Sequence, residues 1–280
     1  MNAAAVRLGG AALLAPGVLI VVLAFLVPLA RLVGLSFSSP AGPFAAYAHL
    51  FGDDIYARVF ANTFFIAIVV TLVALVIAFP VAFALTRLAR TWRGLLFACV
   101  LLPLWISVLV RTFSWMLLLE RNGPLNRLVL ASGLTDAPLP LLFNHTAVLI
   151  GMVHVLLPYA VLPIYAALVR IDPNLLRASE GLGASRLTTF MRVLLPLSLR
   201  GVATAATFTF LLSLGFFITP ALLGGLSSLT LSMLIDGLVS DRLDWPLAAA
   251  ASVVLLASAL VVVAVAARFV SVGTIARVHR

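Results

Sequence analysis

The stretch Leu176–Ser198, LRASEGLGASRLTTFMRVLLPLS, is a polar, arginine-bearing segment set between long apolar runs. Asp172 and Pro173 stand shortly before it. This pair is typical of a helix start, with the aspartate as the cap and the proline in the first turn. The helix is expected to run to Gly181 or Gly183, where glycine permits the chain to turn.

A second helix is expected from about Ala184. Four apolar residues spaced for one helical face support it, namely Ala184, Leu187, Met191 and Leu194. Pro196 should end or kink this helix as the chain enters the next apolar run. The segment is therefore predicted to form two short helices joined by an exposed turn.

Outside this segment the chain has the composition of a membrane protein. It is 64% hydrophobic and 10% charged, with a mean hydropathy of +1.22. A helix needs roughly 20 apolar residues to cross a bilayer, and backbone groups in lipid must be satisfied within the span. Six stretches qualify: 11–35, 60–86, 95–119, 146–169, 202–223 and 245–269. We expect an all-α polytopic protein in which residues 1–280 form a single transmembrane domain.

The charges indicate topology rather than a nucleic-acid partner, although the formal net charge is +9. Twelve arginines fall on the side of the 176–198 segment and five on the other, which predicts that this side and both termini are cytoplasmic. The first apolar run is long for a signal peptide and Phe37–Tyr47 shows no cleavage site, so we expect an uncleaved anchor.

The spacing within the polar segment resembles the "EAA" loop of membrane subunits of bacterial ATP-binding-cassette (ABC) importers. The matching positions are Arg177, Ala178, Ser179, Gly183, Val193, Leu195 and Pro196. Arg177 replaces the family's glutamate and Ser179 its second alanine. The resemblance implies that residues 171–200 dock an ATPase, with Glu180 and Ala184 as further docking residues. The charge reversal at Arg177 puts the detailed contact in doubt.

Two more stretches are similar to polyamine-type permeases. One is Leu109–Trp115, LVRTFSW, followed by Arg121–Gly123, and the other is Phe217–Gly225, FITPALLGG. The resemblance implies the type I importer (MetI-like) fold in a bacterial inner membrane and a spermidine- or putrescine-like solute. It also implies a second permease, an extracytoplasmic solute-binding protein and two ATPase subunits that hold the ATP and magnesium, with no cofactor in this chain.

Arg111 lies well inside an apolar run, where a guanidinium is costly unless it is paired, hydrated or near an interface. It either snorkels to the outer headgroups, forms a pair between helices, or lines a cavity. A cationic solute would prefer carboxylates and aromatic faces, but no acidic residue lies mid-membrane. The candidate translocation path comprises Trp105, Arg111, Trp115, Glu120, Tyr159, Phe216 and Phe217. His154 is interpreted as a buried, hydrogen-bonded histidine.

Other functions find less support in the residues. The chain has no lysine and no phosphate-binding glycine loop, so the energy for transport must come from a partner. Cys99 is alone and the histidines are scattered, so neither a catalytic residue nor a metal site is expected. An ion-coupled transporter would normally need intramembrane carboxylates. The remaining alternative is an ABC permease for another small solute, such as an amino-acid derivative or opine.

Overall fold

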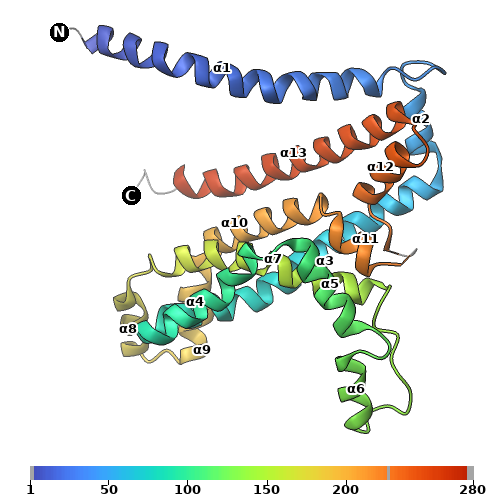
Figure 1. Ribbon diagram of the computed structural model, residues 1–280. Helices are drawn as coiled ribbons and strands as arrows, with labels where there is room; N and C mark the ends of the chain where they lie inside the picture. Colours follow the sequence, from blue (N-terminus) through green and yellow to red (C-terminus); the bar gives the residue numbers. More distant parts are fainter. Residues whose placement is uncertain (1–2, 226–227, 276–280) are drawn as a thin grey trace. The chain divides into compact units, whose positions relative to one another are not determined.

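The computed structural model describes residues 3–225 and 228–275, and every regular element within these ranges is helical (Figure 1). The long apolar helices are α1 (Ala3–Ser36), α3 (Asp54–Arg87), α7 (His145–Leu168), α10 (Leu195–Leu214) and α13 (Trp245–Ile275). The shorter elements are α2 (Ala45–Gly52), α4 (Arg90–Trp105), α5 (Val108–Leu119), α6 (Pro124–Ala131), α8 (Pro173–Gly181), α9 (Arg186–Thr189), the π-helical turn η1 (Phe190–Leu194), α11 (Ile218–Leu223) and α12 (Leu231–Ser240). The all-α prediction is confirmed.

The chain forms two compact units. The first consists of the residues up to Ala57 together with Ile235–Leu256, and the second of Arg58–Leu234 together with the residues from Ala257 on. In the first unit, the Ser36 hydroxyl lies 2.7 Å from the Tyr47 hydroxyl and ties the end of α1 to α2. The second unit contains every residue predicted for docking or for the path.

The core of the second unit is built on α7 and α10, which pack side by side (Figure 1). Small residues allow this close approach, as expected between membrane helices. A Cβ on Gly201 of α10 would meet the Cβ of Ala167 and would lie 2.9 Å from the Pro163 carbonyl oxygen, both on α7. In the same core, α3 contributes a buried stripe spaced by four residues, formed by Ile66, Val70, Ala74, Ala78 and Ala82.

Five helices are long and apolar enough to cross a membrane, and a sixth span exists if one bent pair is counted as a single crossing. That pair corrects the prediction of an unbroken span over 95–119. The chain bends by 102° between Trp105 and Val108, where Ile106 and Ser107 have extended backbone. Pro103 lies in the last turn of α4, where its missing N–H removes one helical hydrogen bond just before the bend.

The prediction of one span over 202–223 is also wrong in detail. Helix α10 begins earlier and ends at Leu214, and α11 begins at Ile218 after a break at Gly215–Phe217. Glycine is a weak helix former, which explains why the helix stops there rather than at Pro220. Pro220 instead lies in the first turn of α11, where a missing N–H is tolerated.

Pro196 does not end its helix, which was one of its two predicted outcomes. Residues Arg186–Leu214 form one continuous span, and the residues just before the proline form the wider π-helical turn η1. In this turn the Leu195 N–H donates to the carbonyl of Phe190, five residues back. The wider turn makes room for the proline ring, which would clash with the carbonyl four residues back in a regular helix.

Candidate functional site

The predicted helix start and end around α8 are both confirmed. Asp172 caps α8 by accepting from the Asn174 backbone N–H at 2.9 Å, and Pro173 occupies the first turn. The helix ends at Gly181, and Gly183 adopts a φ of +86°. That left-handed conformation is one that glycine takes without steric penalty.

The turn after α8 is closed by two backbone hydrogen bonds. The Gly183 N–H donates to the Glu180 carbonyl at 3.0 Å, and the Ala184 N–H donates to the Ser179 carbonyl at 3.2 Å. This pair of bonds is the Schellman arrangement, which satisfies carbonyls that a helix end would otherwise leave free. The turn therefore has one defined shape.

The short helix α9 is tied back onto α8. The Ser185 side chain caps α9 by accepting from the Thr188 backbone N–H at 3.2 Å, and the hydroxyls of Ser179 and Thr189 lie 3.0 Å apart. From Arg186 onward the chain continues without a break into α10. The turn is thus connected to the packed core through one continuous helix.

The apolar stripe predicted for the second helix divides into two parts. Leu187 and Met191 are 72% and 55% exposed, whereas Leu194 is only 5% exposed and belongs to the core. Leu182, at the tip of the turn, is 90% exposed. The tip therefore presents apolar side chains outward, on a segment that also carries several charges.

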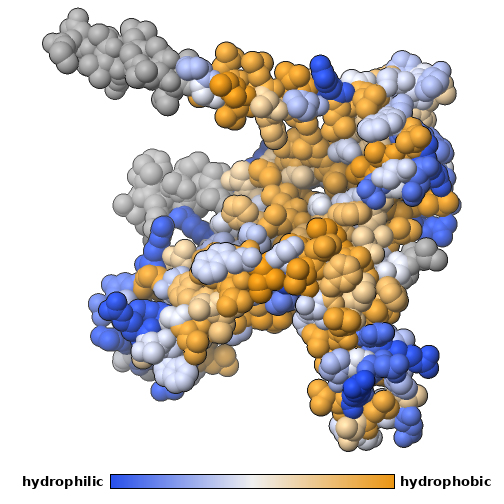
Figure 2. Space-filling view, in the orientation of Figure 1, coloured by the Kyte–Doolittle hydropathy of each residue, from blue (hydrophilic) through white to orange (hydrophobic). Residues whose placement is uncertain are grey.

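The nine predicted docking residues lie along this one path. Arg177, Ala178, Ser179 and Glu180 are on α8, Gly183 and Ala184 form the turn, Val193 is in η1, and Leu195 and Pro196 begin α10. Figure 2 shows hydrophilic side chains gathered where α8 and α9 lie, next to the apolar surface of the long helices.

Within the membrane helices, Arg111 is buried on α5 with 7% of its surface exposed. Its Nε and Nη1 atoms have no hydrogen-bond partner among the residues that the structure describes. It lies within electrostatic range of Tyr159 and His154, both on α7. This burial favours the two interior alternatives, a contact between helices or a cavity lining, over snorkelling.

Trp115, one turn after Arg111, donates from its Nε1 to the Nδ1 of His154 at 3.0 Å. The predicted hydrogen bond of His154 is confirmed, and the histidine is half-buried. The sequence analysis did not identify Trp115 as the partner of His154. The signal was present, because an indole N–H inside a membrane needs an acceptor and His154 is the one imidazole inside a predicted span. Thr112 and Thr219 were missed as well, and their hydroxyls lie 3.1 Å apart and join α5 to α11.

The predicted path residues do not all come together. Arg111, Trp115 and Tyr159 share one region between α5 and α7, and Tyr159 is 40% exposed. Trp105 is 89% exposed at the end of α4. Glu120 lies beyond the end of α5 and is exposed.

Phe216 and Phe217 lie in the break between α10 and α11. Phe216 is partly buried against the core, and Phe217 is 38% exposed. The two rings therefore differ in environment although they are adjacent in the chain.

Residues 38–271 match the family described as binding-protein-dependent transport system inner membrane component. The chain is 34% identical over 203 residues to the spermidine/putrescine transport system permease protein PotB of Escherichia coli, covering 72% of this chain and 74% of that protein. The helices also superimpose on a bacterial alginate ABC transporter, crystallised with an alginate-bound periplasmic protein, with a TM-score of 0.78 at 21% identity over 91% of each chain.

The MetNI methionine ABC transporter is similar as well, with a TM-score of 0.58 at 20% identity over 77% of this chain and 94% of that one. These likenesses confirm the predicted importer permease fold. The match spans every element described above from α2 into α13. The chain belongs to the binding-protein-dependent transport system inner membrane component family.

Proposed function

We propose that this importer permease carries a small amine of the polyamine class, such as putrescine or spermidine. The observation that supports this best is the 34% identity to PotB over about three quarters of the chain. Partly exposed aromatic side chains on α5, α7 and the α10–α11 break supply π faces of the kind that bind ammonium groups. They are Trp115, Tyr159 and Phe217.

In this proposal the ATPase docks on the turn between α8 and α9. The Schellman turn at Gly183 holds the tip in one shape, and the exposed Leu182 and Leu187 are apolar surface that a protein partner would cover. ATP and magnesium are held by two ATPase subunits, so hydrolysis takes place outside this chain. A second permease and an extracytoplasmic binding protein complete the complex.

The proposed orientation places both termini and the docking turn in the cytoplasm. The arginine asymmetry supports it, since loops rich in arginine stay on the cytoplasmic side. The loop between α3 and α4, with Arg87, Arg90 and Arg93 in or beside it, then lies on the same side of the membrane as the docking turn. The membrane is the bacterial inner membrane.

A second candidate solute is an amino-acid derivative that carries a carboxylate. Arg111 supports it, because this buried guanidinium has two N–H-bearing atoms without an acceptor among the described residues. A carboxylate would satisfy a guanidinium through paired hydrogen bonds, whereas a polyamine would be repelled. The two candidate solutes therefore differ in their predicted interaction with Arg111, which is attractive for a carboxylate and repulsive for a polyamine.

Uptake of radiolabelled putrescine and spermidine tests the assignment in cells that lack this chain and in cells with the chain restored. Uptake that is lost and then restored supports the amine. If amine uptake is unchanged while import of a carboxylate-bearing solute collapses, the amine assignment is wrong. As a test of the path, Trp115→Ala should slow uptake more than Trp245→Ala, because Trp245 is 51% exposed at the start of α13. Equal effects would remove Trp115 from the path.

A further inference from the structure

Two adjoining cavities lie beneath α8, where α3 and α7 end. One has a volume of about 410 Å³ and is lined from the ends of α3 and α7, the start of α4, and α8. The other, of about 560 Å³, shares part of this lining and extends to α9 and η1. All these elements lie within the second unit. We call the joined cavities the arginine pocket.

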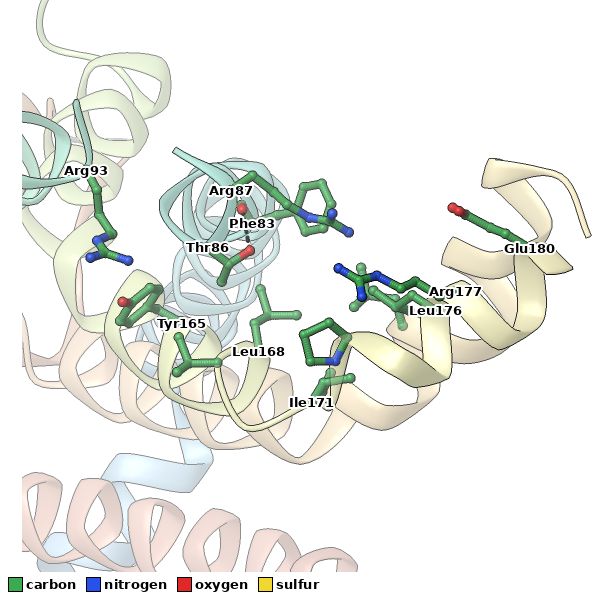
Figure 3. Close-up of a pocket in the computed structure, with 13 residues that line it drawn as sticks. Phe83, Thr86, Arg87, Arg93, Tyr165, Leu168, Ile171, Leu176, Arg177 and Glu180 are labelled. Atoms are coloured by element: carbon green, nitrogen blue, oxygen red, sulfur yellow. Dashed lines mark hydrogen bonds between the residues drawn. The ribbon is translucent and has the colours of Figure 1, made fainter. Parts of the chain in front are cut away.

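Four arginines line the arginine pocket, and one carboxylate stands among them. Arg87, Arg93 and Arg177 line the first cavity, Arg186 lines the second, and Glu180 lines both. Four positive charges against one negative charge leave a formal +3. Figure 3 shows Arg87 and Arg177 extending toward one another across the cavity, from α3 and α8, with Glu180 one turn farther along α8.

None of these arginines forms an ion pair in the part of the chain that the structure describes. The guanidinium of Arg87 lies 5.1 Å above the ring of Phe83, which fixes its direction without neutralising it. Like charges that converge on one cavity repel each other unless an anion lies between them. An anion bound between these arginines would relieve that repulsion, although Arg87, Arg177 and Arg186 are exposed to solvent.

The chemistry and the location of the pocket favour a phosphate. Guanidinium groups bind phosphate oxygens through paired, planar hydrogen bonds. The pocket lies where apolar spans give way to polar segments, and two aromatic residues of the type that anchors helices at the headgroup level are found there. Tyr165 lines the pocket, and Trp92, next to Arg93, is 64% exposed.

We propose that the arginine pocket binds the phosphate of an anionic membrane lipid, and that this lipid holds α8 against the end of α3. Basic pockets between membrane helices on the cytoplasmic side recognise such headgroups. The docking turn follows directly from α8, so the lipid would stabilise the element on which the ATPase docks. A free phosphate compound offers the same chemistry from solution, and the test separates the two sources.

The test measures lipid retention by native mass spectrometry on the full chain purified in neutral detergent. The double variant Arg87→Gln with Arg177→Gln removes two charges from the pocket. The control, Arg90→Gln with Arg170→Gln, removes two exposed charges from neighbouring positions that do not line it. Each form is offered phosphatidylglycerol, phosphatidylcholine or inorganic phosphate, and its melting temperature is recorded to verify folding.

We expect wild-type and control proteins to retain phosphatidylglycerol in preference to phosphatidylcholine. The pocket variant should lose affinity for it by roughly 25-fold, at about five-fold for each arginine removed. If inorganic phosphate displaces the lipid and its binding shows the same sensitivity, the pocket binds phosphate from solution instead. Equal loss in both double variants, or no loss in either, overturns the proposal. So does unchanged lipid binding accompanied by weaker ATPase binding, which would identify the pocket as a protein contact.

Discussion

The substitution Gly183→Ala, which adds a single methyl group, is the sharpest test of the role assigned to the docking turn. Gly183 has a φ of +86° and closes the turn through its N–H to the Glu180 carbonyl. A Cβ there would meet nothing within 4 Å, so Gly183→Ala creates no clash in this chain. Its whole effect is backbone strain, because a non-glycine residue in the left-handed region costs about 1–2 kcal/mol.

That strain predicts a roughly 5- to 30-fold smaller population of the Schellman turn. The apparent affinity of the ATPase for the permease should fall by the same factor, while the melting temperature of the membrane spans should hardly change. Gly181→Ala is the matched control. Gly181 also has open space around its Cβ but lies within α8 without a positive φ, so alanine there should preserve or improve the helix.

The assay is ATPase titration onto the permease reconstituted in nanodiscs, followed by solute-stimulated hydrolysis in the full complex. Gly183→Trp should go further than Gly183→Ala, because its side chain projects from the turn toward the partner and should uncouple transport without unfolding the protein. Wild-type ATPase affinity in Gly183→Ala, or an equal loss in Gly181→Ala, would refute the role assigned to the turn.

Two further predictions concern packing and topology. Gly201→Ala should destabilise the protein by about 1–3 kcal/mol, because the added Cβ overpacks against the α7 backbone. The control Gly94→Ala, in open space on α4, should be neutral or slightly stabilising. Equal melting temperatures of the two variants would contradict the close contact between α7 and α10. In a Cys99→Ala background, a cysteine replacing Asp241 should react with an impermeant thiol reagent in intact cells and one replacing Arg90 should be protected, whereas the reverse pattern would invert the proposed orientation.

The sequence predicted features that depend on local chemistry. Apolar length located the spans, because a run of about 20 apolar residues has few alternatives to a membrane helix. The caps of α8 were predictable from Asp172 and Gly183, since both act on neighbouring backbone groups. The positions assigned to docking lie along a single segment, and their role stays a prediction.

Features that depend on distant partners were not predictable. Pro103 lies inside a predicted apolar run and Pro196 shortly before one, yet the chain breaks soon after the first and continues past the second through η1. Which outcome occurs depends on how neighbouring elements pack around each proline. The burial of Arg111 likewise depends on α7, which lies some forty residues farther along the chain.

The break between α4 and α5 also has a consequence for the life of the protein in the cell. At Ile106–Ser107, directly after α4, the backbone leaves the helix, and Trp105 and Ile106 are 89% and 38% exposed in this chain. Irregular backbone does not occur where it faces lipid tails, so we expect this elbow to be covered by another polypeptide or to border water. A freshly inserted copy without its assembly partners would therefore leave this elbow uncovered, and we expect its abundance to follow that of the subunits that cover the elbow.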